Sequence, residues 1–159
     1  MYIIGANLHI ESGGGATDAT VNGLGNLIVG YNEPNPSSAL SRGGSHNIVV
    51  GMHHNYYSVG GLVAGYQNTI NGPYASIIGG EVNLASGESS SVGGGQYNIA
   101  SGRTCWVSGA IQNTASGFWS SVGGGYQNIA SGDESAVSGG AFWVQTNLGG
   151  WAGGSYSTH

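Results

Sequence analysis

The stretch SVGGGQYNIASG, residues 91–102, returns as SVGGGYQNIASG at residues 121–132. The two copies differ only in the order of one Gln and one Tyr. A catalytic or binding site is needed once in a chain, whereas an architectural unit is needed many times. The repetition therefore predicts a repeat protein whose short turns stack on one another.

The repeat period is set by a column of evenly spaced asparagines. A turn of about 15 residues is too short for a pair of helices, so each turn is predicted to hold two short strands, one at S-x-V-G-G and one at N-x-A-x-G. We expect an all-β fold, a parallel β-roll or β-solenoid. The repeat columns are Asn68, Asn83, Asn98, Asn113 and Asn128; Gly72, Gly87, Gly102, Gly117 and Gly132; and the branched column Leu62, Ile77, Val92, Val107, Val122 and Val137.

The regular repeats are predicted to cover residues 45–142. Residues 1–44 are expected to form divergent N-terminal turns or a cap, with an inserted loop at 34–42 that contains two prolines. Residues 143–159 are expected to form a degenerate C-terminal turn, in which Trp143 stands where the next Asn would fall.

Strand alternation assigns the residues of a turn to opposite faces. Asn98, Ala100 and Gly102 are expected to face inward, whereas Ile99 and Ser101 face outward. Ala and Gly suit the interior of a narrow coil, and Gly at fixed corners is expected to supply positive φ. The Asn amide is expected to bond its own backbone or the Asn of the next turn.

So narrow an interior predicts that the branched apolar column, together with Ile70, Ile99 and Ile129, stays outside. Burial of apolar surface stabilises by about 25 cal/mol per Å². We therefore expect Leu62, Ile77 and the valines of that column to form an interface between identical copies. Repeated apolar columns along one side of a rod favour a symmetric homo-oligomer with the chains side by side.

The charge of the chain excludes several partners. It has no Lys, only Arg42 and Arg103, and a net charge of −5. Nucleic-acid affinity comes mainly from cations on phosphates, so no DNA or RNA partner is expected.

The first ten residues lack the basic region of a signal peptide, and no stretch is long enough to insert in a membrane. The single Cys105 cannot form a disulfide within the chain.

Motifs of catalysis do not occur in the sequence. There is no G-x-S-x-G nucleophile elbow, and without Lys there is no phosphate-binding P-loop. His46, His53 and His54 are close in sequence, but neighbouring strand residues point to opposite faces, so no metal site is expected. The acids are too scattered for an enzyme on a β-helix scaffold. We expect no enzymatic activity and no cofactor.

The positions after each N-x-A-S-G vary from turn to turn, as PYAS, ESSS, RTCW, FWSS and DESA. Aromatic residues on a rigid frame offer a large contact area at small entropic cost. Tyr74, Trp106, Phe118 and Trp119 are therefore candidates for ligand binding. The alternative is that these rings pack between protomers or against a neighbouring turn.

The combined phrase S-x-V-G-G-G-x-x-N-x-A-S-G resembles the head repeats of trimeric autotransporter adhesins, the YadA-type heads, over about residues 45–142. The resemblance implies a left-handed parallel β-roll, three chains side by side, on the bacterial cell surface. It implies adhesion without catalysis, to an extracellular protein or glycan on matrix, host cells or other bacteria. The alternative is a structural subunit of a self-assembling extracellular filament, joined end to end, or of a phage-like tail fibre.

Overall fold

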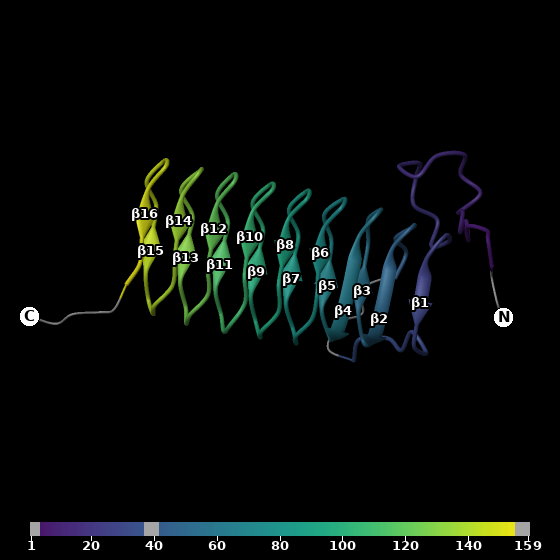
Figure 1. Ribbon diagram of the computed structural model, residues 1–159, viewed down its shortest axis with the longest axis horizontal. Coiled ribbons are helices and arrows are strands. Elements are labelled where there is room, and N and C mark those ends of the chain that lie inside the picture. Colours follow the sequence, from purple (N-terminus) through teal and green to yellow (C-terminus); the bar gives the residue numbers. More distant parts are fainter. Residues whose placement is uncertain (1–3, 37–41, 155–159) are drawn as a thin grey trace, which may run out of the picture.

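The computed structural model describes residues 4–36 and 42–154, and in these the chain winds into a β-solenoid of stacked turns (Figure 1). Residues 37–41 of the loop expected at 34–42, and residues 1–3 and 155–159 of the two terminal segments, lie outside the described residues. Two parallel sheets run along the rod, one on each side of its interior. The predicted all-β parallel solenoid is therefore confirmed.

The nine-stranded sheet, here called the long sheet, contains β1 (Leu27–Val29), β2 (Ile48–Met52), β4 (Leu62–Tyr66), β6 (Ser76–Ile77), β8 (Ser91–Val92), β10 (Trp106–Val107), β12 (Ser121–Val122), β14 (Ala136–Val137) and β16 (Trp151–Ala152). The seven-stranded sheet, here called the short sheet, contains β3 (Asn55–Tyr56), β5 (Thr69–Ile70), β7 (Leu84–Ala85), β9 (Ile99–Ala100), β11 (Thr114–Ala115), β13 (Ile129–Ala130) and β15 (Val144–Gln145). No helix among the described residues is long and apolar enough to cross a membrane.

Neighbouring strands in each sheet pair in parallel, and most pairs join equivalent positions of successive repeats. Val107, for example, lies between Val92 and Val122. The long sheet runs unbroken from β1, within the expected N-terminal cap, to β16, within the expected degenerate turn. Both terminal segments therefore contribute strands to the same stack.

The branched column lies inside the coil, contrary to the expected interface between copies. Ile77, Val92, Val107, Val122 and Val137 are at most 1% exposed within the single chain, which leaves them no surface to offer a second copy. Each faces the small column of the short sheet, which contains Ile70, Ala85, Ala100, Ala115 and Ala130. A branched side chain opposite an alanine fills the narrow interior at the density of a protein core. As predicted, Ile99 and Ile129 point outward, whereas the expectation for Ile70 is wrong: it lies inside, in register with Ala85.

Leu62 lies one full repeat before Ile77 in the sequence, yet it does not belong to this column, so its predicted placement is wrong. The register pairs Ile77 with Val63, which is buried, and Leu62 with Ser76. The corner after Val63 is one residue shorter than the corner after Ile77. Val63 pairs with Ile77 and Tyr66 pairs with Glu81, so Gly79 is the extra residue of the later corner. This extra residue ends β6 after two residues, as in the later strands of the sheet, whereas β2 and β4 pair over five residues.

The asparagine column forms a continuous hydrogen-bonded ladder inside the coil, as predicted. The side-chain Oδ1 of Asn98 accepts the backbone N–H of Asn113 at 2.9 Å. Its Nδ2 donates to the carbonyls of Gly94 at 2.9 Å and Ala110 at 2.8 Å. The same pattern joins Asn83 to Asn98 and Asn113 to Asn128. A buried amide costs little once its donors and acceptor are paired in this way.

Two different residues occupy the ends of this ladder. His54 precedes the first asparagine and accepts the backbone N–H of Asn68 through Nδ1 at 3.2 Å. Trp143 follows the last, and its backbone N–H donates to Oδ1 of Asn128 at 2.9 Å. The indole Nε1 of Trp143 donates to the carbonyl of Gly154, so the indole N–H replaces the side-chain amide N–H of an asparagine. Side chains with suitably placed ring nitrogens thus continue the ladder.

Two glycine columns serve different purposes, and only one matches the expected positive φ. The column with positive φ, which is +82° at Gly80, contains Gly65, Gly80, Gly95, Gly125 and Gly140. The column of Gly72, Gly87, Gly102, Gly117 and Gly132 lies outside that region of φ and is required by close stacking instead. A Cβ added to Gly102 would lie 2.0 Å from the carbonyl oxygen of Gly117 in the next turn. These five positions therefore exclude every larger residue.

Candidate functional site

The variable residues lie at the corner where each short-sheet strand leads into the next long-sheet strand. The second position of this corner has a φ between 53° and 60° in Tyr74, Ser89, Thr104, Trp119 and Glu134. The backbone N–H of Trp119 donates to the carbonyl of Arg103 in the preceding turn at 3.0 Å. The corner backbone is thus the same in every turn, and only the projecting side chains change.

Phe118 and Trp119 form an exposed aromatic pair at one such corner. Their ring centroids are 6.4 Å apart with an edge-to-face arrangement. They are 49% and 59% exposed, so neighbouring turns do not bury them. Asp133 in the next turn accepts the backbone N–H of Phe118 at 2.9 Å, which anchors the corner. This pair offers apolar area on a backbone that cannot easily move.

The other two predicted residues lie apart from this pair. Tyr74 occupies the same position as Trp119 three turns earlier, about 14 Å away at a strand spacing of about 4.8 Å. Its ring lies against Gly60, where an added Cβ would come within 2.9 Å of Cδ1. Trp106 is the outward residue of β10 on the face of the long sheet. All four aromatic side chains are exposed, but they do not form one site.

An ion pair lies near this corner. Nε of Arg103 lies 3.1 Å from a carboxylate oxygen of Glu88 in the preceding turn. Both side chains are about half exposed, so the ion pair contributes little to stability. Cys105 is buried nearby, and desolvation raises the pKa of its thiol to about 11. Such a thiol is poorly nucleophilic at neutral pH.

A second surface, which the sequence did not indicate, is a shallow groove on the outer face of the short sheet. We call it the axial groove. Its wall is formed by Gln112, Gln127 and Phe142, and its floor by Thr114, Ile129 and Val144. The volume is about 360 Å³. The three wall residues come from three successive turns, and so do the three floor residues, so the groove runs along the rod. The sequence signal that could have found it is the Gln that precedes Asn113 and Asn128.

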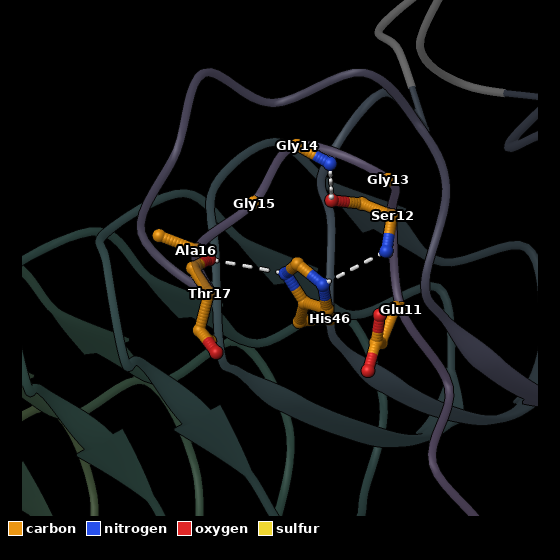
Figure 2. Close-up of a pocket in the computed structure, with 8 residues that line it drawn as sticks. All are labelled: Glu11, Ser12, Gly13, Gly14, Gly15, Ala16, Thr17 and His46. Carbon is orange, nitrogen blue, oxygen red and sulfur yellow. Dashed lines mark hydrogen bonds between the residues drawn. The ribbon is translucent and has the colours of Figure 1, made fainter.

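A third hollow, of about 210 Å³, lies between the loop of residues 11–17 and His46 (Figure 2). The backbone N–H of Ser12 donates to Nε2 of His46 at 3.1 Å, and Nδ1 lies 3.0 Å from the carbonyl oxygen of Thr17. The imidazole therefore carries its proton on Nδ1 and holds both ends of the loop. We assign His46 to the attachment of this N-terminal loop to the solenoid.

The two other histidines considered as metal ligands are also bonded to backbone. Nδ1 of His53 lies 2.7 Å from the carbonyl oxygen of Pro34, and Nε2 of His54 lies 3.0 Å from that of Val50. Within residues 4–36 and 42–154, no three His, Cys, Asp or Glu side chains come together in a way that could hold a metal ion.

In comparisons with known proteins, no protein-family model matches the chain, and no curated protein sequence matches it either. The resemblance to YadA-type heads therefore rests on the repeat phrase, and the solenoid fold is compatible with it.

Proposed function

We propose that the chain is a non-enzymatic binding module, the head or shaft of a fibre on a bacterial cell surface. In this proposal three left-handed β-rolls of the YadA type lie side by side, and the trimer binds an extracellular protein or glycan. The observation that carries the proposal is the exposed Phe118–Trp119 pair on a corner whose backbone is tied to the preceding turn. Three copies of such a pair would raise the effective concentration at a ligand-bearing surface.

The outer face of the long sheet supports side-by-side association. Since the branched column is internal, the interface must use other residues. Near β1 and β2 the outward side chains are apolar and exposed, and they continue to Ile78; this N-terminal apolar face contains Leu27, Val29, Ile48, Val50 and Ile78. Exposed apolar patches of this kind mark sites of association.

Light scattering on a sizing column tests the assembly. We expect the mass of a trimer, and a lower mass for Ile48→Lys, because a charge on the apolar face disfavours burial. Ser91→Lys is the matched control, since Ser91 is the outward residue of β8 on the same sheet. A monomeric wild-type protein, or an unchanged mass in Ile48→Lys, would contradict this interface.

Binding is tested with labelled protein on a glycan array and on a panel of matrix proteins. We expect saturable binding that the double change Phe118→Ala and Trp119→Ala reduces by at least about tenfold, because buried aromatic side chains dominate binding energy. Leu148→Ala is the control, because Leu148 is an exposed apolar residue at the position of Phe118, two turns later. Absence of binding to both panels, or binding that the double variant retains, would refute the proposed function.

A self-assembling filament is the second candidate. β15 and β16 are the last strands of their sheets, and no other described strand pairs with their far edges. Unpaired strand edges are templates for another chain. In electron micrographs, long filaments in place of short discrete particles would favour this function.

A further inference from the structure

The axial groove presents the same two positions in each of three turns. Gln112, Gln127 and Phe142 are equivalent wall residues, and Thr114, Ile129 and Val144 are equivalent floor residues that pair in register on β11, β13 and β15. Adjacent turns are separated by about 4.8 Å, the spacing of hydrogen-bonded strands. A ligand along the groove therefore meets one wall residue and one floor residue at each step of that length.

The wall is polar at one end and aromatic at the other. Nε2 of Gln127 donates to Oε1 of Gln112 at 3.0 Å, which holds the two amides in line. The Gln112 amide nitrogen and the Gln127 carbonyl oxygen then have no hydrogen-bond partner among the described residues. Phe142 stands at the aromatic end, 61% exposed, with its ring packed edge to face on Tyr126 at 5.3 Å. The groove thus offers a donor, an acceptor and a held aromatic ring.

No ionisable side chain lines the groove, which disfavours a charged ligand. The floor combines the Thr114 hydroxyl with the aliphatic Ile129 and Val144. Sugars match this mixture, because their hydroxyls donate and accept hydrogen bonds while their C–H faces pack on aromatic and aliphatic side chains. A peptide that adds a strand needs a free sheet edge, and among the floor strands β11 and β13 are paired on both sides while β15 has a free edge at the end of the stack. A peptide on that edge would run across the groove and not along it.

We propose that the axial groove binds a neutral, extended β-linked oligosaccharide that lies along the rod. Each sugar of a β-1,4-linked chain advances by a length close to the strand spacing of about 4.8 Å, so one sugar faces each turn. Phe142 stacks on one sugar, and the amides of Gln112 and Gln127 bond the hydroxyls of the next two. The biological use of this site rests on the proposed binding function, which it deepens by naming the ligand class.

Titration calorimetry with cellohexaose and chitohexaose tests the site, with dextran as the α-linked comparison. We expect one of the two β-linked hexasaccharides to bind and dextran not to bind. Phe142→Asn should weaken the binding about tenfold, since a stacked aromatic contributes on that order. Asn tolerates the positive φ of 62° at this position, so the fold is kept. Gln127→Leu, which keeps the volume but loses the amide, should weaken it about fivefold.

Tyr31→Asn is the control, because Tyr31 is an exposed aromatic residue that follows β1 of the long sheet and lies outside the groove. Failure of both hexasaccharides to bind, equal binding of dextran, or unchanged affinity in Phe142→Asn would overturn the proposal. So would a solution mass that falls in Phe142→Asn, since the groove would then be an interface between copies. If these outcomes occur while Phe118 and Trp119 still control binding on the arrays, the groove alone is refuted and the proposed function stands.

Discussion

Nδ1 of His54 accepts the backbone N–H of Asn68 at 3.2 Å, in the place that an asparagine oxygen holds in each later turn. Its other nitrogen, Nε2, donates to the carbonyl of Val50 at 3.0 Å. The folded protein therefore needs the neutral imidazole, because a proton on Nδ1 would face the N–H of Asn68. Desolvation by burial lowers the pKa of His54 below the ordinary value of 6.5, against the opposing effect of its backbone hydrogen bonds.

This lowered pKa makes stability depend on pH. The unfolded chain takes up a proton on His54 at a higher pH than the folded protein does. The stability that neutral His54 contributes is therefore fully present above pH 6.5 and is lost as the pH falls towards the lowered pKa of the folded protein. We expect the melting temperature to decrease between pH 7.5 and 5.5, and His54→Asn to remove part of that decrease. A pH profile of His54→Asn parallel to that of the wild type would show that His54 does not carry the effect.

Asn98 in the middle of the ladder should be intolerant of a negative charge. Asn98→Asp keeps an acceptor for Asn113 but loses the two donors that bond the carbonyls of Gly94 and Ala110. Because the site is fully buried, we expect a loss of about 3–5 kcal/mol in the free energy of unfolding, measured with urea at pH 7. Asn71→Asp, on the exposed outer side, should change it by less than about 0.5 kcal/mol. Similar losses in both variants would contradict the ladder.

Gly102 and Gly79 should respond differently to the same substitution. A Cβ at Gly102 would lie 2.0 Å from a backbone oxygen that cannot move without shifting the next turn, whereas a Cβ at Gly79 meets nothing within 4 Å. Gly102→Ala is expected to cost about 3 kcal/mol or more in the free energy of unfolding. Gly79→Ala should be within about 0.5 kcal/mol of the wild type. Equal melting temperatures for the two variants would refute the close-stacking explanation.

Gln145 occupies the alanine position of the interior in the last described turn, and it should limit end-to-end association. Its Oε1 accepts the backbone N–H of Asn147 at 2.9 Å, and its Nε2 donates to the carbonyl of Trp151 at 3.2 Å. The side chain thus bonds backbone groups of its own turn. Gln145→Ala would free them, and we expect a higher sedimentation coefficient that increases with concentration. Gln127→Ala, which does not alter this turn, is the control; identical sedimentation of Gln145→Ala and wild type would exclude the capping role.

The sequence by itself determined the repeat period, the two strands in each turn and the inward asparagine ladder. These follow from local rules, because strand alternation and glycine-rich corners act within a single turn. The same rules could not place the branched column, because in a two-residue strand alternation does not determine which of the two side chains points inward. Only the stacked structure decided that Val107 lies inside, because the alanines of the opposite sheet leave room for it.

The tertiary structure also decided the register between turns and the residues that continue the asparagine ladder, which the repeat pattern alone does not show. The pairing of Val63, rather than Leu62, with Ile77 depends on a single glycine absent from one corner. His54 and Trp143 join a ladder of asparagines because their ring nitrogens reach the same backbone groups, which is a matter of geometry rather than residue type. The axial groove exists only where equivalent side chains of successive repeats come to lie one strand spacing apart. Local sequence sets each turn, whereas the contacts between turns set the surfaces that a ligand or a second copy would meet.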